Sequence, residues 1–194
     1  IYGRGGIIEE KNRFLLFLDS IRGDVMTAVA QCGDTCSRGA ENCVNGITAG
    51  GNMSGTYCHS QGPDPWLLIH LGEVREISKI EVWNRNDIID GVHAFTDRIN
   101  GATIHLTRET SGTVPSWEDN PVWTSTFNGG NISYSFLTGG GGAHARRAGR
   151  YIRIFGLIYA NGTYNLLADE PDAILNLVEV SVFDGDGALI PHDQ

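Results

Sequence analysis

Lys79-Ile80-Glu81-Val82-Trp83-Asn84-Arg85 is a stretch in which branched apolar side chains alternate with polar or larger ones. Successive side chains of a β-strand point to opposite faces. Ile80 and Val82 would therefore face one way, while Glu81, Trp83 and Arg85 would face the other. The stretch predicts a strand with one face in a core.

The same alternation occurs in other short segments of the chain. They are separated by turns rich in Gly and Asn, and the sequence contains 26 glycines. Short strands joined by such turns are typical of an all-β protein, and we expect an antiparallel β-sandwich rather than an α/β fold. The further predicted strands are Trp66–His70, Ala102–Thr107, Pro121–Phe127, Arg150–Phe155 and Leu177–Phe183, with Val178, Val180 and Val182 on one side of the last.

The domain organisation is predicted to be simple. A chain of 194 residues is long enough to bury one core, and no repeat or linker divides it. We expect residues 1–30 to form an N-terminal extension packed on a sandwich of residues 31–194. Within the extension, residues 14–21 fit a short helical face, and residues 25–30 fit either its continuation or the start of a strand.

The charge of the chain excludes some partners. A net charge of −9 disfavours nucleic acid, whose phosphates need clustered Lys and Arg. The longest apolar run, residues 14–18, is far too short to span a membrane, so we expect no membrane insertion. Because the sequence starts at Ile1 rather than Met, we expect a processed mature form.

The cysteines predict disulfides. The four are Cys32, Cys36, Cys43 and Cys58, and an even count permits three full pairings that the spacing alone cannot separate. Zinc is disfavoured because no C-x-x-C spacing occurs. Three N-glycosylation sequons begin at Asn52, Asn131 and Asn161. Together these features predict a secreted, extracellular glycoprotein.

Four polar side chains form the candidate binding site, namely His59, Arg85, Asp87 and Arg98. Guanidinium groups offer forked donors, a carboxylate holds such a fork in place, and an imidazole donates or accepts. This combination suits a neutral ligand rich in hydroxyl groups. No nucleophile or acid–base pair stands beside it, so we expect a binding protein and not an enzyme. Taken singly, these residues also fit a surface ion pair, a loop histidine and a turn cap.

The order of these residues resembles the F-type lectins (fucolectins), whose fold is the discoidin-like jelly roll also found in coagulation-factor C-type domains. His59 is followed after 25 residues by Arg85-Asn86-Asp87, an Arg-x-Asp motif, and then by Arg98. The resemblance covers roughly residues 38–185. Its further matches are Asp64-Pro65-Trp66, Leu71-Gly72, Gly149–Arg153 and Leu177–Val180.

The resemblance implies recognition of L-fucose. His59, Arg85 and Arg98 would donate hydrogen bonds to the ring oxygen and axial hydroxyls of the sugar, and Asp87 would orient the arginines. Ten residues separate Asp87 from Arg98, more than is usual in the family. Ile88 and Ile89 take the place of the adjacent cysteines that often pack the fucose methyl, and would supply an apolar patch. Galactose-type and amino-sugar ligands therefore stay open.

The resemblance also implies a structural calcium ion. Its ligands would come from Asn42, Asn45, Thr56, the carbonyl of Val178, and Glu179. Asn45 replaces a residue that is usually Asp, so Glu179 is the clear carboxylate and the ion would be bound weakly.

The cysteines depart from the family pattern. Tyr57 and Val178 occupy the positions of a usual disulfide, so Cys58 would pair within the N-terminal cluster, with Cys43 or Cys32.

The function predicted from these features is that of a secreted lectin whose partners are glycans or glycoproteins carrying fucose. Binding at a single site would be weak, and we expect a homo-oligomer that gains avidity from several sites. The alternative is a discoidin-like adhesion module that binds protein or lipid and has no sugar recognition.

Overall fold

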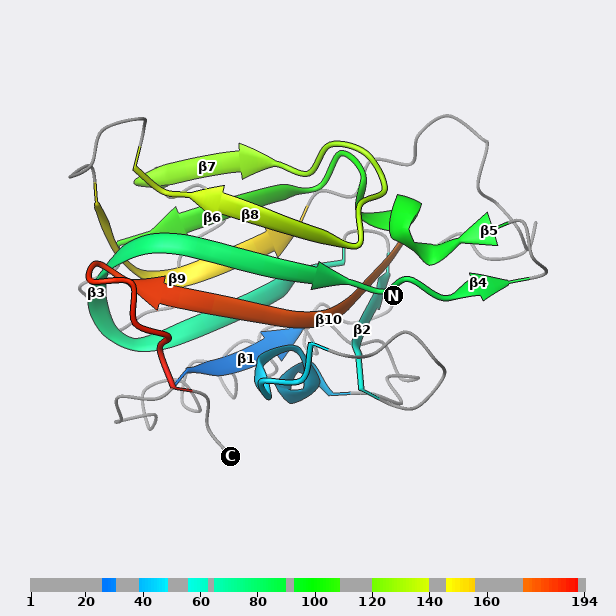
Figure 1. Ribbon diagram of the computed structural model, residues 1–194, viewed down its shortest axis with the longest axis horizontal. Helices are drawn as coiled ribbons and strands as arrows, with labels where there is room; N and C mark the ends of the chain where they lie inside the picture. The colour runs from blue at the N-terminus through cyan, green and yellow to red at the C-terminus, as the bar shows by residue number, and fades with distance from the viewer. Residues whose placement is uncertain are drawn as a thin grey trace, which may run out of the picture.

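Strand β3 (Leu67–Asn84) is the longest element and the organising one. The computed structural model describes residues 26–30, 39–48, 56–62, 65–89, 93–108, 120–139, 146–155 and 173–191 (Figure 1). The other strands are β1 (Thr27–Ala30), β2 (Cys58–Gly62), β4 (Ile88–Ile89), β5 (His93–Ala94), β6 (Thr103–Thr107), β7 (Trp123–Thr126), β8 (Ser133–Leu137), β9 (Arg147–Phe155) and β10 (Ala173–Asp184). Two 3₁₀ turns complete the described elements, η1 (Ala40–Val44) and η2 (Phe95–Ile99).

The two halves of β3 belong to the two layers of the sandwich. Residues 67–70 pair with β1 and β9, and β9 continues to β6 and β7. Residues 77–84 pair with β10 and β8, and β10 continues to β2. Figure 1 shows β3 curling between the layers at one end of the molecule. All of these pairings are antiparallel, so the predicted antiparallel β-sandwich is confirmed.

The core lies between the inner faces of the layers. Ile80 and Val82 of β3 pair with Val182 and Val180 of β10, and all four side chains are buried, as the alternation predicted. β-branched side chains pack well on such a pleated surface. From the other layer, the core receives Leu67, Ile69, Ile104, Leu106, Ile152 and Ile154.

Most predicted strands are present, with three differences. The segments 66–70 and 79–85 are parts of one bent strand, β3. Four short strands, β2, β4, β5 and β8, were not predicted. In β10, a register shift between Leu177 and Glu179 interrupts the expected alternation. Leu177 lies opposite Asn84 and Glu179 opposite Trp83, which leaves Val178 as the extra residue of a β-bulge, so it does not alternate regularly with Val180.

Of the N-terminal extension, the structure describes residues 26–30. Thr27–Ala30 form strand β1. Of the two structures expected for residues 25–30, these four residues therefore adopt the strand. Residues 1–25, with the predicted helical face, lie outside the described residues. Among the residues that are described, no helix has the length and apolar character needed to cross a membrane.

Candidate functional site

Strand β10 brings the predicted site residues to one end of the sandwich. It runs between β2 and β3, and Leu177 lies opposite Cys58 on one side and Asn84 on the other. His59 and Arg85, the next residues along β2 and after β3, therefore flank the start of the same strand. Figure 1 shows the end of β3, the start of β10, β2 and η2 near one another at this end.

Arg85 is held by two neighbours of different kinds. Its Nε donates a 2.6 Å hydrogen bond to Asp87 Oδ2, and its guanidinium carbon lies 4.1 Å from the centre of the Tyr57 ring. Both members of the ion pair are nearly buried, with Arg85 only 6% exposed. A buried, charge-assisted bond is stronger than a surface ion pair, so Arg85 is an ordered donor rather than a mobile surface charge.

Arg98 reaches the same end through η2. Asn84, the last residue of β3, is buried, and its Nδ2 donates to the carbonyl oxygens of Thr96 (2.8 Å) and Asn131 (3.1 Å). The first bond ties η2 to the end of β3, and η2 also packs against β10. Arg98 is half-buried and lies two residues after Thr96.

His59 is a half-buried residue of β2, and it lies directly opposite Asn176 of β10. Opposed residues of an antiparallel pair share one face of the sheet. The backbone positions of His59, Arg85, Asp87 and Arg98 thus lie on the segments that meet at the joined ends of β2, β10 and β3.

The predicted apolar patch lies on a small hairpin that projects from this end. Ile88 and Ile89 form β4, paired with Ala94 and His93 of β5. The longer segment between Asp87 and Arg98 thus contains a hairpin and η2. The side chains of Ile88 and Ile89 lie outside the described part, so their role as a patch stays a prediction.

The residues predicted to bind calcium gather where η1 meets β10. Glu179 is fully buried, and its Oε2 accepts hydrogen bonds from the backbone N–H groups of Asn45 and Gly46, both at 3.0 Å. Gly46 has a φ of 79°, a conformation that glycine adopts readily and that suits this turn. Burial raises the pKa of the Glu179 carboxyl to about 8, and the two backbone bonds partly oppose the shift.

The remaining predicted calcium ligands belong to η1, to β10 and to the segment before β2. Asn42 is part of η1, Val178 precedes Glu179, and Thr56 lies two residues before Cys58, whose sulfur is bonded to Cys43 of η1. Within the described ranges, no group of three His, Cys, Asp or Glu side chains is placed to hold a metal. One buried carboxylate among amide, hydroxyl and carbonyl oxygens fits a hard cation such as Ca²⁺, and disfavours zinc.

The Cys43–Cys58 disulfide confirms one of the two pairings considered for Cys58. It joins η1, which carries Asn42, to β2, which carries His59. Cys32 and Cys36 lie outside the described residues. Of the sequons, Asn131 is exposed in the turn before β8, while Asn52 and Asn161 also lie outside the described part.

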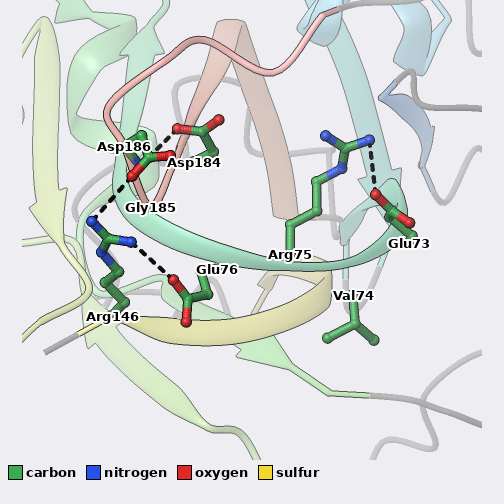
Figure 2. Close-up of a pocket in the computed structure, with 8 residues that line it drawn as sticks. All are labelled: Glu73, Val74, Arg75, Glu76, Arg146, Asp184, Gly185 and Asp186. Atoms are coloured by element: carbon green, nitrogen blue, oxygen red, sulfur yellow. Dashed lines mark hydrogen bonds and ion pairs between the residues drawn. The ribbon is translucent and has the colours of Figure 1, made fainter.

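A pocket lies at the other end of the sandwich, where the bend of β3 meets the end of β10 (Figure 2). Arg146 bridges Glu76 at 3.1 Å and Asp186 at 3.2 Å, and Arg75 contacts Glu73 at 3.4 Å. Glu73, Glu76 and Asp186 thus each contact an arginine, while Asp184 Oδ1 accepts hydrogen bonds from the backbone N–H groups of Asp186 and Ala188. None of the predicted site residues lines this pocket.

Comparison with known proteins identifies the fold. A fucose-binding module from Streptococcus pneumoniae superposes with a TM-score of 0.58 and 19% identity, over 84% of this chain and 94% of that one. The lectin domain of lectinolysin complexed with Lewis B antigen superposes with a TM-score of 0.57 and 16% identity, over 84% of this chain and 94% of that one. A fucolectin from striped bass (Morone saxatilis) serum superposes with a TM-score of 0.56 and 21% identity, over 84% of this chain and 47% of that one.

This chain has the fold of an F-type lectin. It spans about half the length of the bass lectin, and nearly all of the other two domains. No family model matches the sequence, and no curated protein is similar to it in sequence. The likeness is therefore one of three-dimensional structure.

Two residues of the site were not predicted to act there. Tyr57 stands where the family has a cysteine, and its ring lies against Arg85. Asn84 fits the strand pattern of its segment, and its side chain ties η2 to the end of β3. An aromatic residue two positions before His59 and an amide at the end of a strand were the only signals in the sequence.

Proposed function

We propose that this chain binds carbohydrate and recognises L-fucose or a related sugar on glycans. One observation carries the proposal: His59, Arg85 and Arg98 lie around one end of the sandwich, and Arg85 is held by Asp87 and Tyr57. The fold supports it, because structures sharing that fold include a fucose-binding module and a lectin domain complexed with Lewis B antigen.

The chemistry of the three side chains suits a sugar. Two guanidinium groups supply N–H donors in fixed directions, and the imidazole of His59 can either donate or accept. Because Arg85 is already ordered by Asp87 and Tyr57, binding costs little further side-chain entropy. We propose that the protein acts by non-covalent binding and not by catalysis, and that it gains avidity from several copies. Secretion stays part of the proposal, supported by the disulfide.

We further propose that Ca²⁺ binds beside the sugar site, through Glu179 together with Asn42, Asn45, Thr56 and the carbonyl of Val178. The support is the complete burial of the Glu179 carboxylate. A buried carboxylate is costly to ionise, and a cation would offset that cost. The ion would stabilise the junction of η1 with β10 and, through the Cys43–Cys58 disulfide, the strand that carries His59.

The experiment that tests the function is a glycan array, followed by titration calorimetry with the best sugar. We expect selective binding to fucosylated glycans, weakened by a chelator. Arg85→Ala and Arg98→Ala should each lower affinity by about 10- to 100-fold, the loss expected for a hydrogen bond to a charged group. Arg146→Ala is the matched control, since Arg146 lies at the other end of the sandwich.

The outcomes separate the parts of the proposal. Binding that both arginine variants leave unchanged would mean that the site is elsewhere. Selectivity for another sugar would support carbohydrate binding but not fucose recognition. We would then attribute the different specificity to the segment between Asp87 and Arg98. Binding that a chelator does not affect would remove calcium from the proposal and leave the sugar site.

The adhesion module is the second candidate, and one observation favours it. Ile47 and Ile132, near Glu179 and Asn84, are 43% and 55% exposed. Apolar side chains at this end would suit a lipid surface. Cosedimentation with vesicles containing phosphatidylserine tests it: binding that Ile47→Ser and Ile132→Ser abolish, in a protein that binds no glycan, would favour the adhesion module.

A further inference from the structure

We propose that Tyr57 is a positioning residue for Arg85, and that its aromatic ring sets the affinity for sugar. This inference rests on the proposed function, because it concerns how the sugar-binding arginine is held. Nothing in the motif of His59, Arg85 and Asp87 requires an aromatic residue at position 57.

The geometry around Arg85 gives Tyr57 this role. The guanidinium carbon lies 4.1 Å from the ring centre, within the range of a cation–π contact. Asp87 accepts from the edge of the same guanidinium, at Nε. A hydrogen bond at one edge still allows a planar group to rotate about the line of that bond. Contact with a ring fixes the plane, so the two neighbours together define where the remaining N–H groups point.

The backbone at Tyr57 is held in place by its neighbour in sequence. Cys58 follows directly, is buried, and is bonded to Cys43 of η1. From Cys58 onward the chain enters β2, which pairs with β10. Tyr57 therefore stands on a cross-linked backbone. A residue on an ordered backbone loses less conformational entropy when it packs against another side chain. Tyr57 is therefore an effective support for the long side chain of Arg85.

The burial of Arg85 makes orientation decisive. With 6% of its surface exposed, the side chain presents only a narrow part of itself to a ligand. A guanidinium rotated out of its plane would lose the directed hydrogen bonds that distinguish Arg from Lys. Loss of the ring should thus weaken sugar binding even though Tyr57 need not touch the sugar.

The test compares substitutions at position 57 by titration with the sugar selected on the array. Tyr57→Phe keeps the ring, and we expect affinity within about 2-fold of wild type. Tyr57→Leu removes it, and we expect a loss of about 3- to 30-fold, the value of a cation–π contact. Phe183→Leu is the matched control: it removes a ring that lies 3.8 Å from Lys79 Nζ, away from the site, and should leave affinity unchanged.

A fluorinated ring separates positioning from packing. Pentafluorophenylalanine at position 57 keeps the shape of phenylalanine but reverses the charge distribution over the ring face. We expect it to bind sugar as weakly as Tyr57→Leu, whereas a structural role would leave it equal to Tyr57→Phe. It also provides the test if Tyr57→Leu fails to fold.

Each outcome has one meaning. If wild type binds sugar and neither Tyr57→Leu nor the fluorinated ring weakens binding, this inference is overturned while the proposed function stands. Equal affinity for the fluorinated and ordinary phenyl rings overturns it as well. If wild type binds no glycan, the proposed function fails and this inference fails with it.

Discussion

Asn84 at the end of β3 donates a 2.8 Å hydrogen bond to the carbonyl oxygen of Thr96 in η2. This bond joins a core strand to the turn that carries Arg98. Asn84→Ala would leave two backbone carbonyl oxygens without this donor, which costs about 1 to 3 kcal/mol of unfolding free energy. We also expect weaker sugar binding, because η2 loses its attachment. Denaturant titration and calorimetry check both, and Asn128→Ala, at an exposed position, should change neither.

The Cys43–Cys58 disulfide should contribute strongly to stability. It closes a loop with a sequence separation of 15 residues, and a loop of that length predicts about 3 kcal/mol. We expect the Cys43→Ala/Cys58→Ala double variant to unfold at lower denaturant concentration by that amount. Unfolding of the wild type in reductant should shift in the same direction. An unchanged midpoint would mean that the junction of η1 and β2 is held by packing alone.

Gly149 in β9 should not tolerate a side chain. A Cβ atom there would lie 2.4 Å from Leu106 Cδ1 and 3.0 Å from the carbonyl oxygen of Thr107. Gly149→Ala should therefore destabilise the fold by about 1 to 3 kcal/mol through overpacking. Leu106→Ala in the same chain removes both side-chain atoms that the new Cβ would meet, so the double variant should lose less stability than the sum of the two single variants. Thermal unfolding of the single and double variants provides the measurement.

His70 should make stability depend on pH. Burial, with a smaller contribution from the Arg150 cation, lowers its pKa from 6.5 to about 4. The neutral ring has one accepting nitrogen, and Arg150 Nε donates to Nε2 at 2.9 Å, so a second proton placed there would face a donor and have no acceptor. Between pH 6.5 and about 4 the unfolded chain binds the proton more readily, so stability falls as pH falls.

The expected loss over that range is up to about 3 kcal/mol. Denaturant titrations at pH 7 and 4.5 measure it, and His70→Asn serves as the comparison because other groups also titrate there. The variant should lose less stability than wild type on acidification. Equal losses would show that His70 is not the group responsible.

Much of the fold can be predicted from the alternation of apolar and polar residues in the sequence. Alternating branched residues, such as Ile80 and Val82, identify strands because one face must be buried. Strand β8 carried the same signal, with Tyr134 and Phe136 alternating with the exposed Ser133, Ser135 and Leu137, but it was not predicted. The bulge at Val178 has no such signal, since it depends on how β10 meets two partners at once.

Only part of the candidate site was predicted, and it was predicted from the order of its residues rather than from periodicity. Isolated polar residues have no periodicity, so His59, Arg85 and Arg98 were found from their order and from resemblance. What fixes them arises only on folding: the ring of Tyr57, the amide of Asn84 and the burial of Glu179 depend on residues distant in sequence. Such contacts become visible once the strands are placed.

The central position of β10 has a consequence for biosynthesis. Its residues 173–184 are made after those of every other strand in this sequence, yet they join β2 to β3 and supply Glu179. A nascent chain still on the ribosome before this point would present strand edges of β2 and β3 that lack their partner, and such edges recruit other chains. The proposed sugar site would therefore form only after β10 has been made, and a protein shortened before β10 should aggregate.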